Sequence, residues 1–106
     1  MKKSMPEDPL KIIRNNDPEL FGQIENTANL SFADGDIPLK YKLLIAMSLD
    51  ASKGAVDGVK ALARRAMDEG ATKEEMFEVL RIAYYITGAG SIYTAVNGLI
   101  DLFDNE

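Results

Sequence analysis

The sequence predicts an all-α protein, a bundle of five to six helices with short connections. Apolar residues recur at helical spacing along most of the chain, and helix-start signals precede these segments. No segment alternates apolar and polar residues with the period of a strand. The 106 residues suit a single domain. Within it we expect an N-terminal helical segment at residues 1–36 and a helical core at residues 37–106.

The N-terminal segment carries the same helix-start signal twice. Asp8-Pro9 and Asp17-Pro18 each place an N-cap residue before a proline at the first helical position. The first helix should end near Asn15-Asn16, and the second carries apolar residues at helical spacing from Leu20 onwards. Asp34-Gly35-Asp36 then predicts a turn before the core.

The third expected helix begins at Pro38, is apolar on most faces and breaks at Ser52-Lys53-Gly54. The fourth follows and ends at Gly70, a residue typical of the position just after a helix. The third and fifth expected helices are both apolar on more faces than a small bundle usually covers. This pattern indicates contact with another subunit, although helices that cross the bundle centre would explain it equally.

The fifth expected helix opens with a capping box, in which Thr72 can accept the amide proton of Glu75 and Glu75 can reach back. Its last two turns are apolar nearly all round, and Gly88-Ala89-Gly90 ends it. Ser91 is placed to cap the last helix. Three methionines on apolar stripes are expected in the core: Met47, Met67 and Met76.

The residue types that the chain lacks exclude several kinds of chemistry. It contains no cysteine and no histidine, so disulfides, cysteine-ligated zinc and triads of the Ser-His or Cys-His kind cannot form. We expect no metal and no cofactor. Acid–base catalysis would need a carboxylate, a lysine or a tyrosine with a shifted pKa.

Charge and hydropathy limit the partners. With 12 basic and 17 acidic residues the net charge is −5, which argues against a nucleic-acid partner. No run reaches the roughly 18 apolar residues of a membrane span, and no apolar run follows Lys2-Lys3 as it would in a signal peptide. We therefore expect a cytoplasmic protein with neither nucleic acid nor membrane as a partner.

A set of motifs between Pro38 and about Gly98 carries a family resemblance. In chain order the matching pieces are the runs 39–46, Gly54, 66–75 and 79–85 and the turn at 88–90. In this order and spacing the chain resembles the carboxymuconolactone decarboxylase family, which includes the alkylhydroperoxidase D-like proteins. The resemblance implies an all-helical subunit built around a helical hairpin. It also implies a homo-oligomer, a trimer or a hexamer.

The same resemblance assigns positions to the thiol site of the peroxidase branch, a Glu followed by Cys-x-x-Cys-x-x-x-His. The Glu position is Leu43, the cysteine positions are Ala55 and Gly58, and the His position is Leu62. None of these side chains ionises or attacks, so we expect no thiol peroxidase activity and name no catalytic residue. Members of the decarboxylase branch also lack the cysteine pair and tend to keep a His where this chain has Leu62.

The most suggestive polar cluster lies on the fifth expected helix. Arg81 could hold a carboxylate while Tyr84 or Tyr85 donates a proton, since Arg81 and Tyr85 share a face at i, i+4. The same residues would suit a subunit interface with an ordinary ion pair. Lys53 and Asp57, also four residues apart, could line a remaining pocket or form a solvated ion pair.

Ser48 and Asp50 are polar residues on the otherwise apolar third expected helix. A buried carboxylate there would indicate a functional site. A solvent-exposed edge of the helix would explain both polar residues without such a site. Three functions remain open. The chain could be a family member without thiol chemistry that binds a small carboxylate or acts as a scaffold. It could be a decarboxylase-type enzyme acting on a small carboxylated lactone, or an accessory subunit that completes its site with a partner protein.

Overall fold

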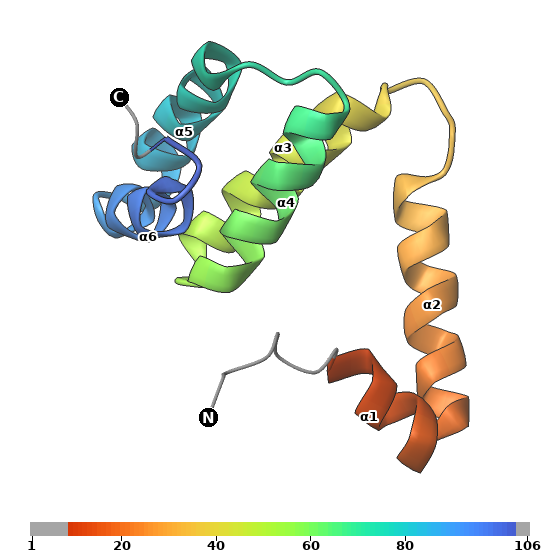
Figure 1. Ribbon diagram of the computed structural model, residues 1–106. Helices are drawn as coiled ribbons and strands as arrows, with labels where there is room; N and C mark the ends of the chain where they lie inside the picture. Colours follow the sequence, from red (N-terminus) through yellow and green to blue (C-terminus); the bar gives the residue numbers. More distant parts are fainter. Residues whose placement is uncertain (1–8, 104–106) are drawn as a thin grey trace. The chain divides into compact units, whose positions relative to one another are not determined.

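The computed structural model describes residues 9–103, and in this range the chain consists of helices without strands (Figure 1). The predicted all-α class and the upper helix count are confirmed. The helices are α1 (Pro9–Asn16), α2 (Pro18–Phe32), α3 (Leu39–Ser52), α4 (Val56–Asp68), α5 (Lys73–Thr87) and α6 (Gly90–Leu99). The cap predicted at Asp8 lies outside the described residues. No described helix combines the length and the apolar character that crossing a bilayer requires.

Local sequence signals account for several of the helix boundaries. The Asp17 carboxylate accepts a hydrogen bond from the Leu20 amide at 3.0 Å and caps α2. The capping box of α5 is present, with Thr72 and Glu75 each accepting from the other's amide at 3.0 Å. Gly70 and Gly88 follow α4 and α5 with φ of +95° and +97°, which side chains rarely adopt.

One predicted cap is wrong. The last helix already begins at Gly90, its N-cap is Ala89, and no side chain caps it. The Ser91 hydroxyl instead donates to the carbonyl oxygen of Gly88 at 2.8 Å. A serine inside the first turn can donate to a carbonyl oxygen of the preceding turn. The Ser91 hydroxyl therefore hydrogen-bonds to the residue that ends α5 and does not cap the start of α6.

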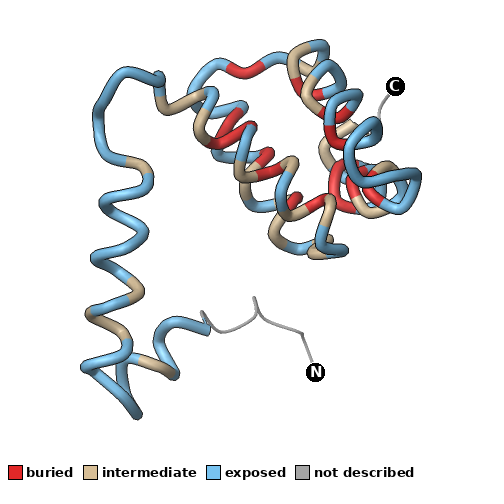
Figure 2. The backbone as a smooth tube through the Cα atoms, turned by 180° about the vertical axis from the view of Figure 1, so that it is seen from behind, coloured by how far each residue is buried: buried red, intermediate tan, exposed pale blue. Residues whose placement is uncertain are grey.

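The chain divides into two compact units, Met1–Ala33 and Asp34–Glu106. In the first unit α1 packs against α2, and the Arg14 guanidinium lies 5.6 Å from the ring centre of Phe21. No residue of either helix is buried (Figure 2). Helices of 8 and 15 residues are marginal in isolation, so this unit has little stability of its own.

The second unit contains the core, formed by one face of each of α3 to α6 (Figure 2). The largest fully buried side chains are those of Leu43, Leu44, Met47, Val59, Met76, Leu80 and Leu99. The core positions of Met47 and Met76 are thus confirmed. The core position predicted for Met67 is wrong, because its side chain is 39% exposed near the end of α4.

A glycine allows α4 and α6 to approach closely. A β-carbon at Gly98 would collide with the side chain of Val59 and the carbonyl oxygen of Val56. Gly98 therefore lets the backbone of α6 rest directly on the first turn of α4. This contact fixes α6 next to the α3–α4 hairpin.

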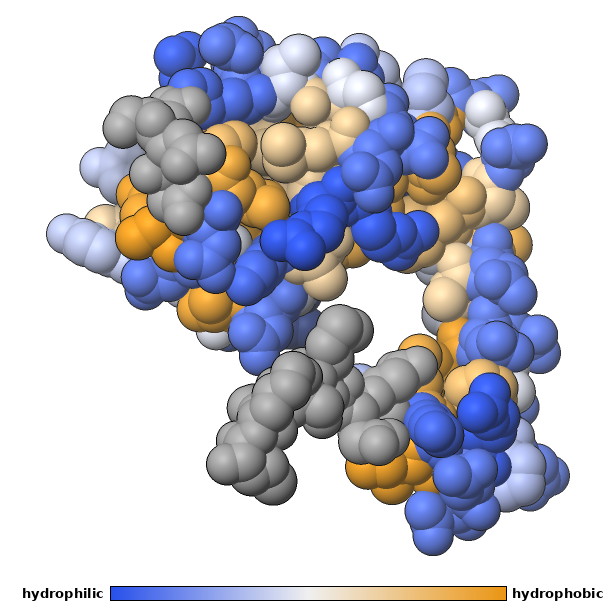
Figure 3. Space-filling view, in the orientation of Figure 1, coloured by the Kyte–Doolittle hydropathy of each residue, from blue (hydrophilic) through white to orange (hydrophobic). Residues whose placement is uncertain are grey.

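The second unit also carries apolar residues that its core does not cover. Tyr41, Ile45 and Leu49 lie on the outer face of α3 and are 43%, 48% and 58% exposed. The space-filling view shows hydrophobic residues at the surface of this unit where α6 lies (Figure 3). The apolar character predicted for α3 thus includes its outer face. Contact with another subunit stays a prediction.

Candidate functional site

The positions that the family resemblance assigns to thiol chemistry all lie on the α3–α4 hairpin. Leu43 is fully buried in α3, whereas Ala55, Gly58 and Leu62 are half-buried at the N-cap, in the first turn and in the middle of α4. Leu43 lines a small hollow of about 160 Å³ near the C-terminal end of α4. No position offers a nucleophile or an ionisable group.

Asp50 provides the only carboxylate of α3, and it faces one of these positions. Its side chain packs against the Cα atom of Gly58 in the first turn of α4. Ser48, the other polar residue considered on this helix, donates its hydroxyl to the carbonyl oxygen of Ile45 at 2.7 Å.

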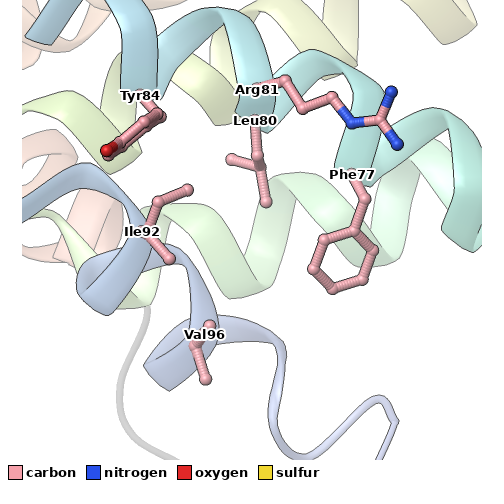
Figure 4. A pocket seen from close by; sticks show the side chains of 6 residues that line it. All are labelled: Phe77, Leu80, Arg81, Tyr84, Ile92 and Val96. Atoms are coloured by element: carbon pink, nitrogen blue, oxygen red, sulfur yellow. The ribbon is translucent and has the colours of Figure 1, made fainter. Parts of the chain in front are cut away.

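A groove of about 380 Å³ lies between α5 and α6 (Figure 4). Leu80 is buried at its base. Its lining side chains are Phe77, Leu80, Arg81, Tyr84, Ile92 and Val96. The volume is at the small end of the range for ligand pockets, and a mostly apolar lining with few polar groups is typical of them.

The apolar surface continues beyond this groove. Phe77 and Val96 also line a second hollow of about 190 Å³, together with Leu99, Ile100 and Phe103. The rings of Phe77 and Phe103 lie 6.3 Å apart, a distance typical of interacting aromatic pairs. The two hollows therefore share one apolar wall.

Two of the sequence-predicted candidates, Arg81 and Tyr84, line the groove, and both are exposed. In the close view the guanidinium of Arg81 extends beyond one end of the groove and the hydroxyl of Tyr84 beyond the other (Figure 4). The apolar side chains of Leu80, Ile92 and Val96 occupy the space between these ends. The geometry thus offers two separated polar ends and an apolar middle.

The other candidates lie elsewhere. Tyr85 is 84% exposed and does not line the groove. Lys53 is the exposed C-cap of α3. Asp57 lines a hollow of about 460 Å³ on the outside of α4 together with Lys60 and Arg64. The structure therefore brings Arg81 and Tyr84 to one surface but places Lys53 and Asp57 outside the groove.

Sequence reasoning missed the apolar residues of the groove, Phe77, Leu80, Ile92 and Val96. The spacing of Phe77, Leu80 and Tyr84 at i, i+3 and i+7 places them on one face of α5. That pattern predicts a face buried in the core. Only the packing of α5 against α6 shows that part of this face is exposed in the groove. No local signal pairs this face with Ile92 and Val96.

Two ion pairs connect α3 with α5 and α4 with the residues that follow α6. Lys40 and Glu75 lie 3.1 Å apart, and Lys60 and Asp101 2.8 Å apart. The Thr72 backbone amide, and then the Lys40 ammonium, lower the pKa of Glu75 below its ordinary value. Glu75 in turn raises the pKa of Lys40. Within residues 9–103 no three acidic side chains gather closely enough to hold a metal ion.

Comparison with models of known protein families shows to which family this chain belongs. The model of the carboxymuconolactone decarboxylase family matches residues 18–100. The chain therefore belongs to the carboxymuconolactone decarboxylase family, and the resemblance seen in the sequence is confirmed.

Two similar proteins extend over most of the chain. The crystal structure of apo-lpg0406, a carboxymuconolactone decarboxylase family protein from Legionella pneumophila, matches with a TM-score of 0.81. It is 30% identical and the match covers 91% of this chain and 85% of that one. The protein described as "Uncharacterized protein MJ1511" from Methanocaldococcus jannaschii is 24% identical over 106 residues, which is 100% of this chain and 99% of that protein.

Proposed function

We propose that this chain is a family member without thiol peroxidase activity that binds a small carboxylate with an apolar body in the groove between α5 and α6. The observation that carries the proposal is the groove itself. Its middle is lined by Leu80, Ile92 and Val96, and its ends carry the Arg81 guanidinium and the Tyr84 hydroxyl. A ligand with an acidic group at one end would meet Arg81 there.

The separation of the two polar groups favours binding over decarboxylation. A decarboxylase acting on a small lactone needs an anion-holding group and a proton donor at neighbouring atoms of one substrate. Arg81 and Tyr84 instead extend toward opposite ends of the groove (Figure 4). The absence of cysteine from the chain supports the proposed lack of thiol chemistry, because a thiolate nucleophile requires that residue.

The proposal includes a homo-oligomer that works in the cytoplasm. Exposed apolar side chains on α3, α5 and α6 support assembly, because a monomer rarely leaves so many in water. Sedimentation velocity on the purified protein measures the oligomeric state, and fractionation of native cells measures the location. An accessory role would instead appear as co-purification with a second protein at fixed stoichiometry.

Calorimetric titration with small aromatic and aliphatic carboxylates tests the ligand class. We expect Arg81→Gln to weaken binding about fivefold, because an exposed ion pair contributes up to about 1 kcal/mol. Val96→Asp should abolish binding by placing a charge in the apolar lining. Arg64→Gln on α4 is the matched control and should bind the carboxylate with the same affinity as the unsubstituted protein. Equal binding by Arg81→Gln and Arg64→Gln would contradict the proposed site.

Turnover assays address the remaining activities. The purified protein should consume no organic hydroperoxide above a blank without protein. It should also release no carbon dioxide from small carboxylated lactones. Carbon dioxide release that disappears in Tyr84→Phe would establish the decarboxylase function in place of simple binding.

A further inference from the structure

The two polar side chains that line the groove between α5 and α6 have no partner in the described part of the chain. Lys40 and Lys60 each form an ion pair with a carboxylate. Within residues 9–103 the Arg81 guanidinium forms neither an ion pair nor a hydrogen bond, and the Tyr84 hydroxyl forms no hydrogen bond. Both groups are therefore available to a ligand that enters the groove.

The surface between these two groups is apolar. Leu80 lies four residues before Tyr84 on α5, so both share one helix face. Ile92 and Val96 have the same spacing on α6. In the close view these apolar side chains lie between the Arg81 end and the Tyr84 end (Figure 4). A polar atom in the middle of a ligand would lose water there without gaining a partner, so that part of the ligand should be apolar.

The two ends of the groove differ in charge. Arg81 is the only charged residue among the described residues that line the groove. A carboxylate at its end gains charge-assisted hydrogen bonds. The hydroxyl of Tyr84 can donate one hydrogen bond and also accept. A second charge on the ligand would meet no opposite charge at the Tyr84 end, whereas an uncharged oxygen would find a hydrogen-bond partner there.

The size of the groove limits the length of the ligand. Its volume is about 380 Å³. At about 30 Å³ for a group of the size of a water molecule, this space holds roughly twelve non-hydrogen atoms. A straight chain of up to about eight carbons with an oxygen function at each end stays within that limit.

We propose that the groove binds an aliphatic monocarboxylate that carries an uncharged hydroxyl or carbonyl oxygen at the far end of its chain. The carboxylate meets Arg81, the chain covers Leu80, Ile92 and Val96, and the terminal oxygen forms a hydrogen bond with the Tyr84 hydroxyl. The inference rests on the carboxylate binding of the proposed function. It adds a class of ligand and makes Tyr84 the residue that selects the far end.

Calorimetric titration with matched pairs of probes tests the selection. Each pair consists of a straight-chain carboxylate and the same carboxylate with a terminal hydroxyl, such as hexanoate and 6-hydroxyhexanoate, in chains of about four to eight carbons. For at least one length we expect the hydroxylated probe to bind about threefold more tightly, as one neutral hydrogen bond allows. The preference should be confined to a few lengths, because α5 fixes both polar residues.

The neighbouring tyrosine provides the matched control. Tyr84→Phe removes the hydroxyl and keeps the ring, so the affinity of the hydroxylated probe relative to its partner should fall to about one or below. Tyr85→Phe makes the same change at a residue that does not line the groove, and it should keep the preference. Both tyrosines are exposed, so the helical circular dichroism should be the same in the two variants as in the unsubstituted protein.

The outcomes separate this inference from the proposed function. Equal affinities within every pair, or a preference that persists in Tyr84→Phe, would overturn the inference. A dicarboxylate that binds more tightly than the hydroxylated probe of the same length would overturn the uncharged far end. If straight-chain carboxylates still bind in a manner that depends on Arg81, the proposed function stands and this inference alone fails. If none of the probes binds the unsubstituted protein, both are overturned.

Discussion

The carboxylate of Asp50 fills the space beside Gly58 that a β-carbon at position 58 would need. The two residues therefore depend on each other, because the absence of a side chain at Gly58 leaves room for the Asp50 carboxylate against the first turn of α4. A side chain at 58, such as the cysteine that the resemblance assigns there, requires Asp50 to move. The absence of a side chain at Gly58 is thus matched by a neighbour that occupies the space.

A double-mutant cycle measures this dependence. Gly58→Ala should gain up to about 1 kcal/mol of helix propensity in the Asp50→Ala background, where no carboxylate obstructs the new methyl group. With Asp50 present, displacement of its carboxylate should offset most of that gain. We expect a coupling free energy of about 0.5–1 kcal/mol, measured by urea unfolding. Additive effects of the two substitutions would contradict the proposed contact.

The close approach of α6 to α4 predicts a cost at Gly98. Gly98→Ala places a methyl group against Val59 and a backbone carbonyl, neither of which can turn aside, so unfolding should become easier by about 1–3 kcal/mol. Gly22→Ala is the comparison, since a β-carbon there meets nothing within 4 Å. That variant should be as stable as the original chain or up to about 1 kcal/mol more stable.

The capping box predicts a specific loss at the start of α5. Thr72→Ala removes the acceptor for the Glu75 amide and should destabilise the fold by about 1 kcal/mol. Thr27→Ala provides the comparison, because its hydroxyl only donates to the carbonyl of Gln23 within an exposed helix. Its effect should stay within about 0.5 kcal/mol. Equal losses of unfolding free energy in the two variants would show that the cap contributes no specific stabilisation.

The pKa of Glu75 predicts how stability depends on pH. Because folding lowers this pKa, the stabilisation is complete above the ordinary value of 4.5 and is lost as the pH falls through the lowered value. Glu75→Gln should therefore show a shallower decline in melting temperature between pH 6 and about pH 3. Lys40→Met should retain part of the decline, since the Thr72 backbone amide is the larger cause.

Local chemistry made several helix boundaries predictable. Asp17-Pro18, the Thr72–Glu75 box and Gly70 each act through hydrogen bonds or backbone angles within a few residues, and the structure contains all three. Ser91 shows the limit of such reasoning. A hydroxyl at a helix start can accept from the following turn or donate to the preceding one, and the neighbouring backbone decides between them.

The candidate site could be predicted only in part, because it depends on contacts between helices. Arg81 and Tyr84 were identifiable as polar residues on an apolar helix. Their placement at opposite ends of a groove follows from Ile92 and Val96 on α6, which no sequence spacing connects to them. The contact of Asp50 with Gly58 is equally remote from local pattern, since it depends on how the α3–α4 hairpin closes.

The connection between α2 and α3 has a practical consequence for handling the protein. Residues 33–38 are all exposed and include Asp34-Gly35-Asp36, a composition that proteases cut readily. Every buried residue of the described chain lies after this connection. A nick there would leave a fragment of about 8 kDa that keeps its core, so degraded preparations should yield a persistent smaller band.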